Sequence, residues 1–148
     1  AGGSARSIIY QLQMMGANVI NANRTENKSE KIKKSLNINF DICSLQDIPS
    51  ILKEIDFVVN TTSLGIDGTK NNLVDFDLLK EKSYVYDLIY NPKRTPFLMN
   101  AEQKGHQVHQ IDRDFLKHPP NREVKSVDVD GYTMAWHHNV VANERTFL

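Results

Sequence analysis

The sequence predicts an α/β protein with a Rossmann-like, doubly wound parallel sheet. A glycine-rich turn, Ala1-Gly2-Gly3-Ser4-Ala5, opens the chain, and an apolar helical run follows it. Apolar stretches typical of buried strands then alternate with amphipathic helices up to residue 111. Strands that alternate with helices favour parallel pairing, because a crossover between parallel strands needs a helix-length connection.

The elements before residue 61 each carry a local signal. Gly16 ends the first helix in a left-handed conformation, and Ile32 and Leu36 give the second helix one apolar face. Pro49 predicts a kink in the third helix, or a start delayed to about Ser50. The expected helices are residues 4–15, 29–36 and 45–55, and the expected strands are residues 17–20, 38–42 and 56–60.

The second half begins with a polar loop over residues 61–72. Thr95 is expected to cap a helix that Gly105 stops. The expected helices are residues 76–80, 95–104 and 132–147, and the expected strands are residues 84–90, 108–111 and 124–129. We assign residues 1–111 to one nucleotide-binding domain and leave residues 112–148 as a C-terminal segment, either part of that domain or separate from it.

The strand that should precede the glycine-rich turn is expected to be absent. In the register Gly-x-Gly-x-x-Ala, the first glycine falls just before residue 1. That strand normally lies in mid-sheet beside residues 17–20, so its absence leaves backbone groups unpaired. We therefore expect marginal stability, unless a strand at residues 124–129 or a partner chain covers the gap.

Composition argues against several classes of protein. Lys plus Arg and Asp plus Glu both number 18, so no net field attracts nucleic acid or an anionic membrane. The single cysteine, Cys43, excludes an internal disulfide, fits a reducing cytoplasm and is expected to be a buried thiol. The five histidines have no Cys or Glu partners at metal-binding spacing, so we expect no metal.

Two segments carry the expected chemistry of a dinucleotide site. Gly2 allows close approach of a pyrophosphate, and Ala5 allows the helix to pack tightly on the sheet. Arg24 stands where a fold that prefers NAD places an acidic residue, and a guanidinium pairs with a ribose 2′-phosphate that a carboxylate would repel. With Lys28 one turn further on, the sequence favours NADP over NAD. The alternative is a surface arginine without a ligand.

A polar loop follows the strand at residues 56–60, with the sequence Asn60-Thr61-Thr62-Ser63-Leu64-Gly65. Small polar groups after a buried strand can contact a ribose or a nicotinamide ring, although an Asn- and Thr-rich turn without a ligand is the alternative. A second segment, Asp87-Leu88-Ile89-Tyr90-Asn91-Pro92, ends the next strand and is expected to point the Tyr90 hydroxyl into the cleft.

Taken together with Asn23-Arg24-Thr25 and the helix start at Thr95, these motifs resemble the nucleotide-binding domain of the shikimate dehydrogenases over about the first 105 residues. The resemblance implies an NADP-linked oxidoreductase that reversibly reduces 3-dehydroshikimate to shikimate in aromatic amino-acid biosynthesis. It implies that Tyr90 approaches the substrate. The candidate cofactor-binding residues are Gly2, Gly3, Ser4, Ala5, Asn23, Arg24, Thr25, Lys28, Thr61, Thr62, Ser63 and Gly65.

The chain departs from the family pattern in two places. The catalytic Lys and Asp of the family belong to an N-terminal substrate domain that this chain lacks, so we assign no catalytic residue to it. In the tail, Gly131 and Met134 match the family, whereas Asp130 and His138 do not. A quinate/shikimate dehydrogenase and a non-catalytic nucleotide-binding module remain as alternatives, and a homodimer is one option for assembly.

We expect the chain by itself to bind NADP without oxidising shikimate, because it contains no evident group for proton transfer at the carbonyl. The measurement is NADPH absorbance with purified chain, NADP and shikimate. A rise in absorbance that depends on shikimate would contradict this expectation.

Overall fold

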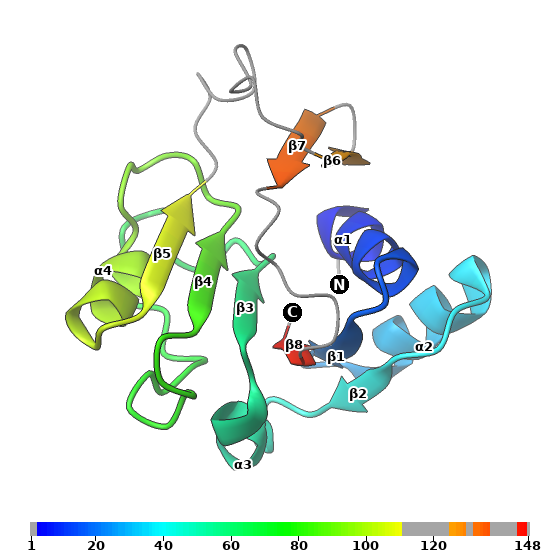
Figure 1. The fold of residues 1–148 in the computed structure, drawn as a ribbon, viewed down its shortest axis with the longest axis horizontal. Coiled ribbons are helices and arrows are strands. Elements are labelled where there is room, and N and C mark those ends of the chain that lie inside the picture. Colours follow the sequence, from blue (N-terminus) through cyan, green and yellow to red (C-terminus); the bar gives the residue numbers. More distant parts are fainter. Residues whose placement is uncertain (1–2, 111–124, 130–131, 137–144, 148) are drawn as a thin grey trace.

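The structure, a computed structural model, describes residues 3–110, 125–129, 132–136 and 145–147. Six strands form one sheet in the order β2-β1-β8-β3-β4-β5, and every pair of neighbours in it is parallel (Figure 1). The strands are β1 (Asn18–Ala22), β2 (Asp41–Cys43), β3 (Phe57–Asn60), β4 (Tyr84–Asp87), β5 (Gln107–Gln110) and β8 (Arg145–Phe147). The expected parallel α/β sheet is confirmed.

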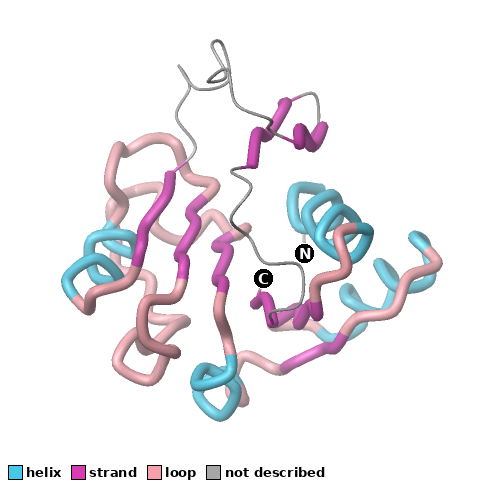
Figure 2. Tube along the Cα trace, in the orientation of Figure 1, coloured by secondary structure: helices cyan, strands magenta, loops and turns pink. Residues whose placement is uncertain are grey.

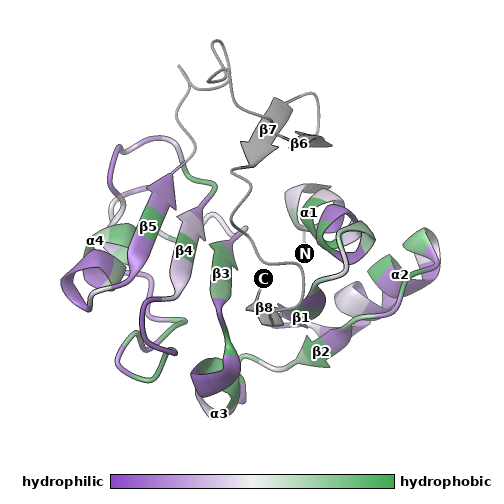
Figure 3. Ribbon diagram, viewed as in Figure 1, coloured by the Kyte–Doolittle hydropathy of each residue, from purple (hydrophilic) through white to green (hydrophobic). Residues whose placement is uncertain are grey.

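Helices cover both faces of this sheet. Ile8, Ile9 and Leu12 of α1 (Gly3–Met14) and Ile32 of α2 (Glu26–Leu36) pack on one face. The other face is covered by α3 (Ile48–Ile51), the 3₁₀ helix η1 (Leu52–Glu54) and α4 (Pro96–Gln103). This two-sided burial explains the continuous apolar run of β3, which is mostly green in Figure 3.

Most of the expected elements form, with shifted ends. Gly16 and Gly105 adopt φ values of 83° and 86°, the left-handed conformation expected where each helix stops. The Thr95 hydroxyl accepts a hydrogen bond from the Leu98 N–H at 3.3 Å, as expected for the cap of α4. The third helix begins late, with Pro49 in its first turn, and finishes as a 3₁₀ helix.

The helix expected at residues 76–80 is wrong. No helix or strand occurs in residues 61–83, a long connection between β3 and β4 (Figure 2). The Asp75 carboxylate accepts a hydrogen bond from the Asp77 N–H at 3.0 Å, and the Lys80 N–H donates to the Leu52 carbonyl at 3.1 Å. The second bond takes the Lys80 N–H, which a helix over residues 76–80 would direct to the Phe76 carbonyl, while Val74, Phe76 and Leu79 are still buried in the core.

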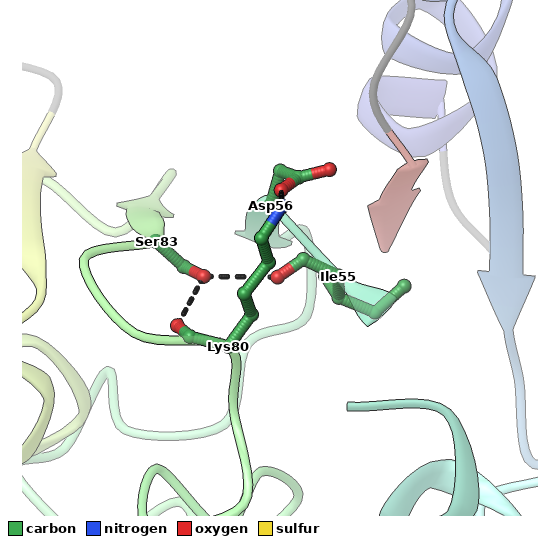
Figure 4. A network of polar contacts seen from close by, with 4 residues as sticks. All are labelled: Ile55, Asp56, Lys80 and Ser83. Carbon is green, nitrogen blue, oxygen red and sulfur yellow. Dashed lines mark hydrogen bonds and ion pairs between the residues drawn. The ribbon is translucent and has the colours of Figure 1, made fainter. Parts of the chain in front are cut away.

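Polar contacts hold the end of this connection at the amino edge of the sheet (Figure 4). The Ser83 hydroxyl lies 2.9 Å from the Ile55 carbonyl and 2.5 Å from the Lys80 carbonyl. Lys80 forms an ion pair with Asp56, the residue before β3. The start of β4 is therefore tied to the start of β3, at the edge opposite the site described below.

Cys43 is a buried free thiol at the end of β2, as the sequence predicts. Burial, and secondarily the charge of Asp47, raises the pKa of this thiol, so it is protonated at neutral pH. Its sulfhydryl lies 3.1 Å from the Ser44 carbonyl. The residue contributes to the packing of the core.

The helix expected at residues 132–147 is also wrong where the structure describes it, because residues 132–136 and 145–147 form strands; residues 137–144 lie outside the described residues. Residues Tyr132–Trp136 form β7, which pairs antiparallel with β6 (Lys125–Val129). This hairpin lies beside α1. The sequence contains the signal that was missed, because Asp130-Gly131 is a hairpin dipeptide and Tyr, Thr and Trp favour strands.

The position between β1 and β3 is filled by β8. Val19 and Ile20 are the partners of Thr146 and Phe147 on one side, and Phe57 and Val58 are their partners on the other. We expected either residues 124–129 or a partner chain at this position. The first of these is wrong, because residues 125–129 form β6 and pair with β7. The division of the chain into two segments at residue 111 stays a prediction.

Replacing Thr146 with proline should destabilise the fold, because proline removes an N–H from a strand that is paired on both sides. The expected loss is about 1–3 kcal/mol for a buried backbone group left without its partner. Urea unfolding followed by circular dichroism measures it. The control, Thr146→Val, keeps a β-branched residue and the N–H, and equal stability of the two variants would contradict the pairing.

Candidate functional site

A cavity of about 480 Å³ opens at the carboxyl ends of β1 and β3. Parallel α/β sheets bind ligands at this edge, where the loops that follow the strands converge. The polar residues that line it are Asn21, Asn23, Arg24, Thr25, Lys28, Asn60, Thr61, Thr62, Ser63 and Asn71. The apolar residues are Ala22, Leu45, Ile48, Val58, Val59, Leu64, Leu73, Val74 and Phe97.

The tip of β1 is held against α2 by a buried pair of polar side chains. The Ser29 hydroxyl donates to Asn21 Oδ1 at 2.5 Å, and both residues are buried. Asn23 follows β1, and its Oδ1 accepts a hydrogen bond from the Thr25 N–H at 3.3 Å. These contacts turn the chain from β1 into α2 and bring the first turn of α2 to the cavity.

Two exposed basic side chains stand at this end of the cavity. Arg24 precedes α2 and Lys28 lies in its first turn, and both line the cavity. Thr25 is the N-cap residue of α2, but its side chain makes no capping hydrogen bond. Positive side chains beside a helix N-terminus without a side-chain cap are an arrangement suited to an anion.

The loop after β3 is folded around the side chain of Asn60. Asn60 Oδ1 accepts hydrogen bonds from Thr62, from its N–H at 3.1 Å and from its hydroxyl at 2.7 Å. Thr62 Oγ1 in turn accepts one from the Leu64 N–H at 3.2 Å. Although Thr62 and Leu64 are exposed, their backbone is bonded to the buried Asn60, through the Thr62 N–H and through the Leu64 carbonyl, which accepts from Asn60 Nδ2 at 3.4 Å.

A buried carboxylate, that of Asp87, lies next to Asn60 at the end of β4. Its Oδ1 accepts hydrogen bonds from Asn60 Nδ2 at 3.1 Å and from the Ile89 N–H at 3.0 Å. Its Oδ2 accepts one from the Thr95 hydroxyl at 2.6 Å. Burial raises the pKa of Asp87, and these three hydrogen bonds oppose the rise.

Two amide donors beside the cavity have no partner. Asn23 Nδ2 and Asn71 Nδ2 are buried and make no hydrogen bond with the residues that the structure describes. The Oδ1 of Asn71 accepts a hydrogen bond from the Leu73 N–H at 3.1 Å. This bond fixes the orientation of the amide, and the Nδ2 group remains without a partner among the described residues. A buried donor without a partner costs free energy unless something accepts its hydrogen bond.

Seven of the candidate cofactor residues meet in this cavity: Asn23, Arg24, Thr25, Lys28, Thr61, Thr62 and Ser63. Ser4, Ala5 and Gly65 do not line it, and Gly2 lies outside the described residues. Gly3 begins α1, and Ala5 is fully buried, in agreement with a packing role. Gly65 is buried with φ 99°, a conformation that side chains rarely adopt.

Tyr90 follows β4 at the same edge of the sheet, is 55% exposed and does not line the cavity. The backbone around it is held by Gln110 at the end of β5, whose Nε2 donates to the Ile89 carbonyl at 2.5 Å and to the Pro92 carbonyl at 2.8 Å. The approach of the Tyr90 hydroxyl to a substrate stays a prediction, because the side chain is exposed at the sheet edge and is not part of the cavity wall.

Sequence reasoning missed Asn71 and the apolar wall that Leu45 and Ile48 provide. Nothing in the local sequence distinguishes Asn71 from its neighbour Asn72, because the long connection that places it has no periodic pattern. Within the described part of the chain, no group of His, Cys, Asp and Glu side chains could hold a metal. The described helices also include none with the length and hydropathy to span a bilayer.

The fold and the location of the cavity define a Rossmann-like α/β domain with its site at the carboxyl edge of the sheet. The family model described as shikimate / quinate 5-dehydrogenase matches residues 1–83. The chain belongs to this family.

Individual relatives agree with the family model. A shikimate dehydrogenase (NADP(+)) of Caldanaerobacter subterraneus is 36% identical over 71% of this chain and 39% of its own length. One of Staphylococcus aureus is 34% identical over 74% of this chain and 40% of its own length. The crystal structure of shikimate dehydrogenase from Thermotoga maritima superposes with a TM-score of 0.58 at 34% identity, covering 74% of this chain and 42% of that one. The chain thus spans about two-fifths of the length of the curated relatives.

The buried Asp87 should make stability depend on pH. Because its pKa is raised in the folded chain, the folded state binds the proton more tightly than the unfolded state, and stability falls as pH rises through and above the ordinary aspartate range. Asp87→Asn removes this titration. Urea unfolding of both proteins at acidic and neutral pH should show the wild type losing stability relative to Asp87→Asn on going to neutral pH, and a gain would contradict the assignment.

Proposed function

We propose that this chain is the NADP-binding portion of a shikimate dehydrogenase, which reversibly reduces 3-dehydroshikimate to shikimate by hydride transfer. One observation carries the proposal. In a chain of this family, one cavity collects Arg24, Lys28, the N-terminus of α2 and the polar loop after β3. The two curated relatives described above bear the name shikimate dehydrogenase (NADP(+)), which supports the same choice of cofactor.

The chemistry of the residues fits NADP. The guanidinium of Arg24 and the ammonium of Lys28 suit the 2′-phosphate, with the backbone N–H groups at the start of α2 as further donors. The unpartnered amides of Asn23 and Asn71 suit acceptors on the ribose and the base. The apolar side chains of Leu45, Ile48 and Leu73 suit the face of an aromatic ring.

The remaining residues of the site would orient the reacting end. When bound, the nicotinamide ring supplies or accepts the hydride. Thr61, Thr62 and Ser63 present hydroxyl and backbone groups on a loop that Asn60 fixes, so they would hold the ribose and ring without large rearrangement. Gly65 keeps the loop free of a side chain where it bends. Tyr90 would approach the substrate from the loop after β4.

We assign no proton-transfer residue in this chain and place the enzyme in the cytoplasm, with a homodimer as one form of assembly. The family model also covers quinate, and the described residues favour neither substrate acid over the other. A non-catalytic nucleotide-binding module is the second alternative. Calorimetric titration with NADP separates a chain that binds the nucleotide from a scaffold module that does not bind it.

Arg24→Ala should weaken NADP binding by about tenfold or more while changing NAD binding by less than about twofold, because only NADP carries the phosphate that the guanidinium pairs with. Isothermal titration calorimetry with each cofactor measures the two dissociation constants.

The matched control is Lys31→Ala, which removes the same charge from α2 at an exposed position that does not line the cavity. It should leave NADP binding nearly unchanged. Equal losses for NADP and NAD in Arg24→Ala would refute the role of Arg24, and absence of any NADP binding by the folded wild type would refute the proposed function.

A further inference from the structure

Three segments of the chain meet at one carboxylate. Asp87 accepts hydrogen bonds from Asn60 at the end of β3, from the backbone of Ile89 in the loop after β4, and from Thr95 at the start of α4. All three donors are neutral, and Asp87 itself is fully buried. It does not line the cavity.

The contacts continue from Asp87 to the cavity through Asn60. The Nδ2 of Asn60 donates to Asp87, which fixes the amide so that its Oδ1 faces Thr62. Thr62 then accepts from the backbone of Leu64, and both residues line the cavity. Two hydrogen-bonded steps therefore join a buried carboxylate to the loop that is proposed to hold the nicotinamide half of the cofactor.

The same carboxylate fixes the segment that leads to Tyr90. Its bond to the Ile89 N–H sets the direction of the chain one residue before Tyr90. The loops after β3 and β4 also lie close together, since a Cβ on Gly65 would come within 3.8 Å of the Ile89 Cδ1 atom. Asp87 thus acts on both loops at the place where they approach each other.

We propose that Asp87 is a positioning residue that sets the cofactor loop after β3 and the Tyr90 loop at a fixed separation, so that the nicotinamide half of the cofactor is bound in one orientation. This inference rests on the proposed function. It predicts that Asp87 controls affinity for one half of the ligand only. The other half, with the 2′-phosphate, is held at the tip of β1 by residues that Asp87 does not contact.

The free-energy cost of burying the Asp87 carboxylate favours a role in positioning the two loops, because packing alone does not require a charged group. A carboxylate buried among neutral donors pays a desolvation penalty, and apolar residues of similar volume often fill such a position with equal or better stability. A single acceptor with four lone-pair sites, however, can orient three donors at once. A site in which two loops must keep a fixed separation needs a group that orients several donors at once.

The test uses two probes, NADPH and adenosine 2′,5′-bisphosphate, which carries the 2′-phosphate and lacks the nicotinamide. Both are titrated by calorimetry into the full 148-residue chain and into Asp87→Ala. We expect NADPH binding to weaken about tenfold, since a poorly oriented loop loses contacts to the ring. Binding of the bisphosphate should change by less than about twofold.

A conservative variant separates orientation from folding. Asp87→Asn keeps the oxygen that accepts from Asn60 and Ile89 and replaces the oxygen that faces Thr95, so it should restore part of the NADPH affinity. Amide hydrogen exchange gives a second readout. In Asp87→Ala the Thr62 and Leu64 amides should exchange faster, although neither contacts Asp87.

Asp56→Asn is the matched control, because it changes another aspartate that is bonded to a side chain but lies at the opposite edge of the sheet (Figure 4). It should leave both titrations unchanged. Equal weakening of both probes in Asp87→Ala, or no change in either, would overturn the positioning role. If Asp87→Ala does not fold, the same comparison is decided by Asp87→Asn and by Thr95→Val. A folded wild type that binds neither probe would instead contradict the proposed function.

Discussion

The site depends on the continuity of the parallel sheet between β1 and β3. The basic end of the cavity, with Arg24 and Lys28, is built on the tip of β1, and the polar loop that also lines it is built on the tip of β3. These two strands are not neighbours, and each is paired with β8. Unpaired backbone groups in mid-sheet would be costly, so the short strand β8 both satisfies them and sets the distance between the two halves of the site.

Sequence reasoning succeeded where structure follows from local patterns. The buried run of β3, the amphipathic α2, the Thr95 cap and the glycine stops at residues 16 and 105 are all decided by a few neighbouring residues. It failed at residues 76–80, because the Leu52 carbonyl takes the Lys80 N–H that a helix would need. At residues 132–136 it failed because the hairpin signals, the Asp130-Gly131 pair and the strand-favouring Tyr, Thr and Trp, were given too little weight.

The candidate site also contains some residues that the sequence predicts and others that it does not. Arg24, Lys28 and the loop after β3 were predictable, because strand ends converge at one edge of a parallel sheet whatever the details of packing. The proposed role of Asp87 was not predictable from the sequence, because it depends on a hydrogen bond to Asn60, 27 residues away in the chain. Asn71 was hidden for a similar reason, because a connection without helix or strand brings it to the cavity. Long-range polar contacts leave no period in a sequence.

Family membership and sheet assembly draw on different parts of the chain. The family model matches residues 1–83, which contain β1, β3 and the polar residues that line the cavity. The strand that joins these parts, β8, comes from residues 145–147, outside the matched range. The family match therefore covers the polar residues of the cavity, whereas the link between the two strands that carry them depends on an element that the match does not include. Substitutions in β8 would therefore act on the cavity through the pairing that holds β1 and β3 in place.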